Sequence, residues 1–309
     1  MLNRTPIFVL GGSDSEPGPV PKDMERSRML RGCKGTIDLP IGHCLAQELI
    51  DRIRSAELFH EPVIFGPRRV YDGLVDCRIV DVEGNLADTL RAVRIEVLRQ
   101  TDLSRPVAFT TCDILPTSDE YRELLDACYF PNSKSCLWGQ LVAEEPTAMG
   151  ASSWKPAYQF RPNDNSIPRT MYPGHLLIAR PAAVRIRLMN HLLQLAYRHR
   201  NLRLLSRPVP MIAKGIGRLM LEDSRNLLRG QLPILSVSIP WHCLAAFFQF
   251  QRGRLSVPSF SRSIMKVFLH RDFHHGEFPP VVFSTTSILS FAKDIDTEDE
   301  LAELTELFA

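Results

Sequence analysis

The sequence predicts an α/β protein with a mostly parallel central sheet and helices on both faces. Strand-like and helix-like segments alternate through the first 130 residues at the spacing typical of β-α-β units. The first strand-like segment, PIFVLGG at 6–12, is an apolar run that ends in two glycines. Because ligands of such sheets bind at the carboxyl ends of the strands, the residues that follow each strand are the first candidates for a site.

The first half of the chain is predicted to contain four strands and three helices. In each helix, apolar residues recur every three or four positions with charged residues between them, as in LAQELIDRIRSA at 45–56. The third helix also carries acidic residues in its first turn, where they interact favourably with the helix dipole. In order, the elements are a strand at 6–12, a helix at 45–56, strands at 62–66 and 78–82, a helix at 85–100, a strand at 106–116 and a helix at 118–130.

The second half is less regular. VRIRLMNHLLQLAYRHR at 184–200 has apolar residues on one helical face, and the last segment, 294–309, has the pattern of an acidic helix with an N-terminal cap. No internal repeat and no shift in composition divides the chain, so a single domain is expected. In order, the predicted elements are a strand and turn at 175–184, helical segments at 184–200 and 211–228, an uncharged segment at 230–251, a strand at 281–284 and the final helix.

The uncharged segment GQLPILSVSIPWHCLAAFFQFQ is close to the length of a membrane span. Pro233 and Pro240 would interrupt a spanning helix, and four polar residues dilute its hydrophobicity. A buried strand, turn and helix is therefore the favoured interpretation, and contact with a membrane surface is the alternative.

Composition restricts the class of protein. The 309 residues suffice for one sizeable core, and 44% hydrophobic with 23% charged residues is typical of a soluble globular protein. A net charge of +2 is too small for non-specific binding to phosphate backbones, so nucleic acid is not expected as a main partner. The apolar run at the N-terminus is too short for a signal peptide, which predicts a cytoplasmic protein.

Neither cysteine nor histidine indicates a zinc site. The seven cysteines contain no CxxC pair, so reduced thiols are expected. His270 and His274 have the spacing of one helical face, with His275 beside them, but Gly276 and the flanking aromatic residues favour a loop.

Two glycines and two aspartates follow predicted strands. Gly11 and Gly12 would allow a sharp turn and the close approach of a phosphate to backbone amides, although a plain turn explains them equally. The loop GGSDSEPGPVP matches neither GKS or GKT nor GxGxxG, which argues against a P-loop ATPase and a Rossmann dehydrogenase. Asp113 and Asp296 could share a Mg²⁺ ion at the sheet edge, or could serve only in a turn and as a helix cap.

Taken together and in order, five segments resemble the MobA-like nucleotidyltransferases. The resemblance implies a GT-A/Rossmann-like three-layer α/β sandwich with a mostly parallel central sheet and a helical C-terminal insert at about 184–275. It covers most of residues 6–130 and the end of the chain, where DIDTEDEL is the most specific piece. The five segments are IFVLGGSDSEPGPVP, GCKGTIDLPIGHCLAQELIDRIRSA, EGNLADTLRA, AFTTCDILP and DIDTEDELAEL.

The resemblance also implies a function. It implies Mg²⁺-dependent transfer of a nucleotidyl group from an NTP to a phosphorylated acceptor, with release of pyrophosphate. Residues 1–130 would form the nucleotide-binding half, 131–280 the acceptor-binding half, and 281–309 a closing strand and helix. The implied site residues are Gly11, Gly12 and Ser13, whose amides would hold phosphates; Lys34, which would neutralise charge on the reacting phosphate; and Asp113 and Asp296, which would bind the metal.

Further residues are implied for the nucleoside and the acceptor. Asn85 would face the base or ribose. Lys155 matches the lysine of the acceptor region, and His175 stands where an asparagine is usual, although a solvated lysine and a hydrogen-bonded histidine are the simpler explanations. The segment at 230–251 would suit a lipid-like acceptor or an oligomer interface.

The first loop departs from the family. A long insert precedes Lys34, and it carries Asp14 and Glu16 where a polyanion should bind. The alternative to an active enzyme is therefore a catalytically degenerate protein that binds nucleotides or regulates. A GT-A glycosyltransferase is less favoured because the chain lacks a mid-chain Asp-x-Asp. The residues that could restore positive charge to the loop are Lys22, Arg26, Arg28 and Arg31.

Overall fold

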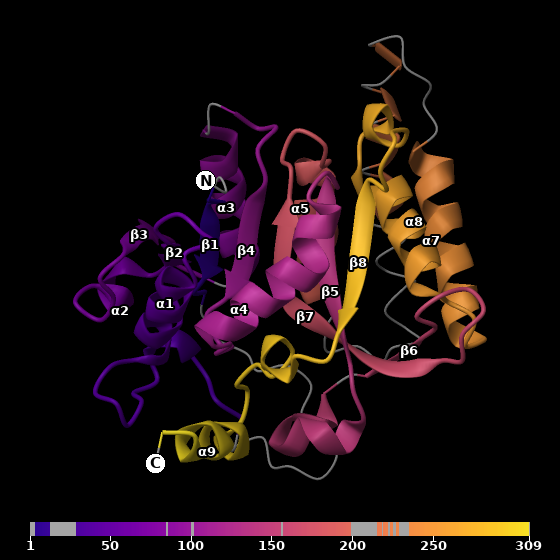
Figure 1. The fold of residues 1–309 in the computed structure, drawn as a ribbon. Helices are drawn as coiled ribbons and strands as arrows, with labels where there is room; N and C mark the ends of the chain where they lie inside the picture. The colour runs from indigo at the N-terminus through magenta and orange to yellow at the C-terminus, as the bar shows by residue number, and fades with distance from the viewer. Residues whose placement is uncertain are drawn as a thin grey trace.

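A computed structural model of the protein describes residues 4–12, 29–84, 86–99, 102–155, 157–198, 215–217, 219–221, 223–224, 227–228 and 235–308. An eight-stranded sheet with the order β3-β2-β1-β4-β7-β5-β8 crosses the molecule, and the short β6 pairs with β7 (Figure 1). Of these strands, β7 runs against its neighbours and the others all point the same way. The strands are β1 (Ile7–Leu10), β2 (Val63–Gly66), β3 (Arg78–Asp81), β4 (Val107–Thr111), β5 (Leu137–Ala143), β6 (Tyr158–Phe160), β7 (Arg169–Ala179) and β8 (Val281–Thr286).

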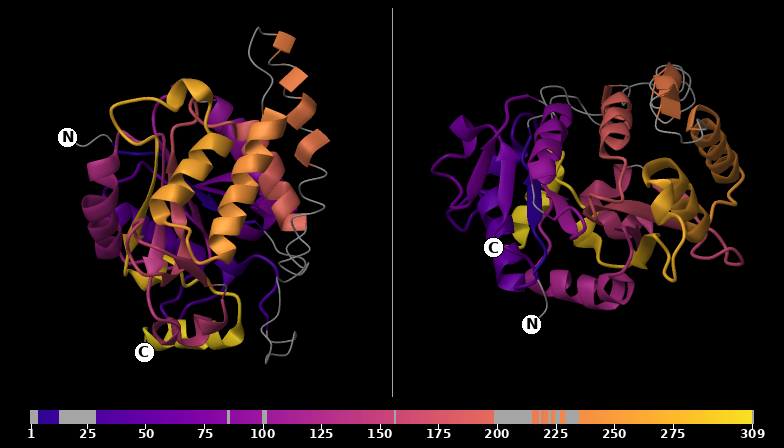
Figure 2. Two further views of the ribbon diagram at one scale, coloured as in Figure 1. Left: turned by 90° about the vertical axis from the view of Figure 1, so that its right-hand side faces the viewer. Right: turned by 90° about the horizontal axis from the view of Figure 1, so that it is seen from above.

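Helices cover both faces of the sheet (Figure 2). One face carries α1 and α4, and the other carries α3, α5 and α8. The helix α7 packs mainly against α8, and it touches the sheet through Phe250, whose ring lies 5.9 Å from that of Tyr158 in β6. The longer helices are α1 (Leu45–Ala56), α3 (Leu86–Arg99), α4 (Ser118–Leu124), α5 (Ile186–Arg198), α7 (Leu235–Gln251), α8 (Val257–Phe268) and α9 (Glu298–Glu306); α2 (Arg68–Tyr71) and the 3₁₀ segments η2 (Lys34–Thr36), η5 (Pro146–Trp154), η6 (Arg271–Phe273) and η7 (Leu289–Phe291) are short.

The strand β1 shows why the sheet lies between two helical layers. Alternate side chains of a strand point to opposite faces. Ile7 and Val9 belong to the core beneath α1 and α4, whereas Phe8 belongs to the core beneath α3. The ring of Phe8 lies 5.1 Å from that of Phe65 and 5.8 Å from that of Phe109. A strand that is apolar on both sides is stable only when both faces are covered.

The predicted fold class is confirmed: the chain is an α/β sandwich of the GT-A/Rossmann-like type with a mostly parallel sheet. The four strands and three helices predicted in the first half are present as β1 to β4, α1, α3 and α4. The predicted strand at 175–184 is the second part of β7, which begins earlier and runs antiparallel. The strands β5 and β6 and the helix α8 were not predicted; in the predicted helix at 211–228, the described residues 215–217, 219–221, 223–224 and 227–228 are helical.

The prediction of a buried strand, turn and helix at 230–251 was wrong. The described part of this segment is one helix, α7, in which Pro240 removes a single backbone donor. The backbone N–H groups of Leu235 and Ser236 donate to the carboxylate of Asp223, at 2.8 and 2.7 Å, and this satisfies the start of the helix. The helix is only partly buried, because Leu235 and Ile239 lie in a core cluster whereas Trp241 is 68% exposed. Within the described residues, no helix is both long enough and apolar enough to cross a membrane.

Candidate active site

The candidate site lies where β4 and β8 end, at the carboxyl edge of the parallel strands (Figure 1). The chain leaves β4 through Asp113, and it leaves β8 through η7 to reach Asp294 and Asp296. The two exits are tied together, since the N–H of Ile295 donates to the main-chain carbonyl of Asp113 at 2.8 Å. The N–H of Leu30 donates to the carbonyl of Asp296 at 2.8 Å, which brings in the segment that carries Lys34.

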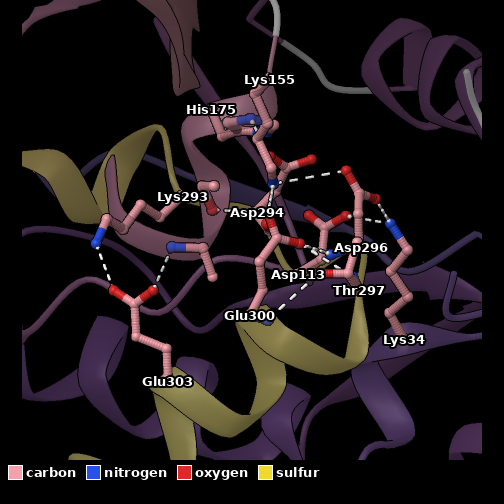
Figure 3. A network of polar contacts seen from close by, with 12 residues as sticks. Lys34, Asp113, Lys155, His175, Lys293, Asp294, Asp296, Thr297, Glu300 and Glu303 are labelled. Atoms are coloured by element: carbon pink, nitrogen blue, oxygen red, sulfur yellow. Dashed lines mark hydrogen bonds and ion pairs between the residues drawn. The ribbon is translucent and has the colours of Figure 1, made fainter. Parts of the chain in front are cut away.

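Three carboxylates converge at this edge, as Figure 3 shows. One oxygen each from Asp113, Asp294 and Asp296 lies within 4.8 Å of the others. The Oδ1 atom of Asp113 is buried and accepts no hydrogen bond from the described residues. A buried acceptor normally has a partner, so this oxygen is well suited to a ligand or a cation.

Two buried lysines neutralise the carboxylates. The Nζ atom of Lys34 forms an ion pair with Asp296 and lies 3.5 Å from Asp113 Oδ2. The Nζ atom of Lys155 contacts the carboxylate and the main-chain carbonyl of Asp294, and lies 3.5 Å from Asp296 Oδ2. The side chains of Lys34 and Lys155 are 11% and 7% exposed. Asp296 is therefore shared between two ammonium groups (Figure 3).

The charge pattern holds Lys34 protonated and two carboxylates ionised. Burial by itself would lower the pKa of Lys34, but Asp113 and Asp296 outweigh burial and raise it. Burial would raise the pKa of Asp113, yet Lys34 and then His175 outweigh burial and lower it. The pKa of Asp296 is lowered in the same way, because Lys34 and Lys155 outweigh its burial.

Asp294 behaves in the opposite way. Burial raises its pKa, and the negative charges of Asp296 and Asp113 add to that effect. His175 and Lys155 offset it only in part. The group of three carboxylates thus contains one member that resists ionisation until more positive charge arrives.

His175 projects from β7 toward the same group (Figure 3). Its Nδ1 atom lies 3.1 Å from Thr111 Oγ1, at the end of β4, and its Nε2 atom lies 3.7 Å from Asp294 Oδ1. The antiparallel pairing of β4 with β7, in which Thr110 is opposite Leu176, brings this histidine to the carboxyl edge of β4.

The start of α9 fixes the aspartates in place. Thr297 caps the helix, and Glu300 accepts hydrogen bonds from the backbone N–H groups of Thr297 and Asp296 at 2.9 and 2.7 Å. The other oxygen of Glu300 lies 3.1 Å from Lys155 Nζ and accepts from Ser152 Oγ at 2.7 Å. One buried carboxylate thus joins α9, η5 and the acidic group.

The glycines near the site are required by close packing. The amide of Gly11 donates to the carbonyl of Phe65 at 2.8 Å, and a Cβ atom there would lie 3.0 Å from the hydroxyl of Tyr71. The predicted use of the Gly11 amide as a phosphate donor is therefore wrong, because the sheet already occupies it. A Cβ atom on Gly35 would lie 2.9 Å from the same hydroxyl and 3.1 Å from the Cβ atom of Ala46. This close approach positions the neighbouring Lys34.

The structure brings together most of the residues that the sequence singled out. Lys34, Asp113, Asp296, Lys155 and His175 all belong to one network. Gly12 follows β1, the neighbour of β4, whereas Ser13 and Asn85 lie outside the described residues, as do Lys22, Arg26 and Arg28. Within the described residues, the three aspartates are the one group that could hold a metal ion, and it does not include the histidines at 270–275.

The sequence analysis missed two members of the network, Asp294 and Glu300. A signal was present for each. Asp294 is two residues before Asp296, and in an extended chain such residues point to the same side. Glu300 is three residues after Thr297, the spacing of a capping box.

No protein-family model matches the chain, and no curated protein sequence matches it. A solved structure of a hypothetical transferase from Thermus thermophilus is similar to the chain, with 18% identity and a TM-score of 0.55 over 97% of this chain and all of that one. At this identity, the similarity shows a common fold.

Two further structures are more distant. A CMP:2-keto-3-deoxy-manno-octonic acid synthetase in complex with CTP has 9% identity and a TM-score of 0.43, over 62% of this chain and 78% of that one. A protein described as a mannose-1-phosphate geranyltransferase, also from Thermus thermophilus, has 14% identity and a TM-score of 0.40, over 64% of this chain and 61% of that one.

Proposed function

We propose that the protein is a nucleotidyltransferase, which moves an NMP group from an NTP to a phosphorylated acceptor and releases pyrophosphate. One observation carries the proposal: three aspartates and two buried lysines meet at the carboxyl edge of a mostly parallel sheet. Ligands of open α/β sheets bind at this edge. Mixed positive and negative charge at one point suits a complex of a polyphosphate with a divalent cation.

The donor set fits Mg²⁺. All three candidate ligands are carboxylates, which Mg²⁺ prefers, and Asp113 Oδ1 has no hydrogen-bond donor among the described residues. Asp113 and Asp296 would hold the ion. When bound, it would neutralise charge on the phosphates and polarise the reacting phosphoryl group.

The residues of the chain then have separate tasks. When Asp113 and Asp296 bind a cation, their ion pairs with Lys34 break. The ammonium group of Lys34 is then available to a phosphate oxygen. Lys155 stays anchored by Asp294 and Glu300, and it keeps Asp296 in place. His175 faces the same space and is the candidate contact for the acceptor phosphate.

The transfer needs no covalent enzyme intermediate. An oxygen of the acceptor phosphate attacks the α-phosphorus, the bond from the α-phosphorus to the bridging oxygen breaks, and the electron pair leaves with pyrophosphate. A phosphate dianion is already deprotonated, so no general base is required. The contribution of the protein is positioning and charge neutralisation.

The test is a thermal-shift measurement with ATP, GTP, CTP and UTP, each with and without Mg²⁺, followed by a pyrophosphate-release assay. A ligand that binds only the folded protein raises its melting temperature. We expect one nucleotide to give a Mg²⁺-dependent shift that is lost in Asp113→Asn. Asp126→Asn, an exposed aspartate of the same charge, is the matched control and should keep the shift.

An equal shift in wild type and Asp113→Asn would overturn the metal assignment. No shift with any nucleotide would overturn the whole proposal. The acceptor class is then found by adding phosphorylated sugars, phosphorylated alcohols and lipid phosphates to the assay.

A non-catalytic nucleotide-binding protein is the second candidate. The observation that favours it is the Gly11 amide, which is bonded to Phe65 and is not available to a triphosphate. This candidate predicts a Mg²⁺-dependent thermal shift without pyrophosphate release for any acceptor tested.

A further inference from the structure

A cavity lies far from the aspartates, between α7, α8 and the segment that follows α8. It has a volume of about 340 Å³. Most of its lining is cationic or can become so: Arg185, Lys266, Arg271, His242, His274 and His275.

The basic side chains of this pocket form no close ion pair within the described part of the chain, although the charge of Asp223 acts on Arg185 from a greater distance. None of the carboxylates described there lies within 4.0 Å of the side-chain nitrogens of Arg185, Lys266 or Arg271. The nearby Asp223 uses both oxygens to accept N–H groups at the start of α7. Burial lowers the pKa of Arg185, the charge of Arg271 lowers it further, and the charge of Asp223 offsets these effects only in part. Like charges that face one cavity favour the binding of an anion.

The pocket and the acidic group lie at opposite ends of β8. Leu269, at the end of α8, is buried in the same cluster as Val281, where β8 begins, whereas the aspartates follow the other end of that strand (Figure 1). The six residues of β8 alone span roughly 20 Å at about 3.3 Å per residue. An anion in this pocket is therefore too distant to take part in chemistry at the aspartates.

We propose that this pocket is a second binding site, and that it binds the phosphate group of a phosphate monoester. Two arginines and a lysine supply permanent charge, and arginine presents the paired N–H donors that suit phosphate oxygens. The histidines add further polar groups to the wall. The site is separate from the proposed transferase centre and does not depend on that function.

The phosphate monoester could come from a soluble metabolite or from a lipid headgroup. The lipid headgroup is considered because an exposed apolar face of α7 lies beside the pocket. Val237, Trp241, Leu244 and Phe248 recur at helical spacing, and all are exposed. A helix with an apolar stripe beside a cationic pocket has the features of a surface that contacts anionic lipid.

The experiment compares two ligands with the same phosphate monoester. Binding of glycerol 3-phosphate is measured by calorimetry, and binding of phosphatidic acid is measured by sedimentation with phosphatidylcholine vesicles that contain it, in both cases without Mg²⁺ or nucleotide. The test variant is Lys266→Glu with Arg271→Glu. The control is Arg262→Glu, on α8 but outside the pocket.

We expect wild type and the Arg262→Glu variant to bind one of the two ligands. The double variant should bind the same ligand at least about tenfold more weakly, because a loss of this size is expected when a charge-assisted hydrogen bond is removed. Glycerol 3-phosphate binding would identify a soluble ligand, and binding only to the vesicles would identify a lipid. The proposal is overturned if neither ligand binds, or if Arg262→Glu weakens binding as much as the double variant does. Asp113→Asn should bind normally, so failure of this proposal is distinguishable from failure of the proposed transferase function.

Discussion

The ion pairs of Lys34 can be tested separately from its proposed contact with a phosphate. In the absence of a cation Lys34 is the partner of Asp113 and Asp296, so its removal takes the ammonium partner from Asp113 and leaves Asp296 with Lys155 alone. Breaking such a buried pair from one side costs about 3 kcal/mol. We expect Lys34→Met to lower the free energy of unfolding by roughly this amount in EDTA, and by clearly less in Mg²⁺, as measured by urea denaturation.

Lys293→Met is the control for Lys34. Lys293 forms a single ion pair with Glu303, at 2.8 Å and partly exposed, which is worth less than about 1 kcal/mol. The loss of unfolding free energy in Lys293→Met should be the same in EDTA and in Mg²⁺. An equal loss for Lys34→Met in the two buffers would mean that the carboxylates do not exchange the lysine for a cation.

The raised pKa of Asp294 predicts that the stability of the protein depends on pH. Because its pKa is raised in the folded protein, the folded state binds more protons than the unfolded state from about pH 4 upward. Stability in EDTA should therefore fall as the pH rises through the raised pKa of Asp294. The lowered pKa values of Asp113 and Asp296 act in another window, since they reduce stability as the pH falls below about 4.

The measurement is the urea midpoint between about pH 4 and about pH 7, in EDTA, for wild type and for Asp294→Asn. In Asp294→Asn, most of the fall in the urea midpoint with rising pH should be absent. Asp126→Asn should keep this fall, because that aspartate is exposed. A decline of the same size in Asp294→Asn would assign the titration to another group.

At the scale of elements, α9 holds the site through one residue. The side chain of Glu300 is 3% exposed and has four partners: two backbone N–H groups, Ser152 and Lys155. We expect Glu300→Ala to cost about 3 kcal/mol of unfolding free energy, because it removes one of the carboxylates around the buried Lys155 and leaves two backbone N–H donors and Ser152 without their partner.

Glu303→Ala, one turn later in the same helix, is the comparison for Glu300. Glu303 is partly exposed and binds Lys293 and the N–H of Ala151, so its replacement should cost about 1 kcal/mol. Chemical denaturation of both variants tests the pair. If the two variants lose the same unfolding free energy, the contacts of Glu300 do not stabilise this part of the protein more than those of Glu303 do.

At the scale of the whole molecule, the reactivity of the cysteines measures which parts of the core are protected from solvent. Cys112 is buried directly after β4, and burial, with Asp113 beside it, raises its pKa to about 12. Cys44 is buried at the start of α1, whereas Cys243 is exposed on α7. We expect a thiol reagent to modify Cys243 in the native protein and to reach Cys44 and Cys112 only after unfolding, as read by mass spectrometry.

Cys243→Ser should remove the modification on α7 without changing the protection of the other two residues. Rapid modification of Cys112 in the native protein would contradict the position of β4 in the centre of the sheet. Protection of Cys243 would mean that the exposed face of α7 is covered, either by a second copy of the chain or by another ligand.

The amino-acid sequence was enough to predict the alternation of strands and helices and the residues at the strand ends. Both follow from local patterns: apolar periodicity distinguishes α1 from β2, and a polar residue directly after an apolar run marks the end of β4. Asp113 and Asp296 were found in this way, and Lys34 through the family resemblance. Their meeting could be anticipated because parallel strands place their carboxyl ends at one edge.

The tertiary structure alone decided the direction of β7, the role of Asp294 and the orientation of α7. Strand direction depends on hydrogen bonds with β4 and β5, which lie far from β7 in sequence, and no local pattern encodes them. The raised pKa of Asp294 results from its burial, which is modified by charges from four separate segments. A helix rich in apolar residues was expected to be buried, but burial depends on what packs against each face, and in α7 only one side has a partner in the described part of the chain.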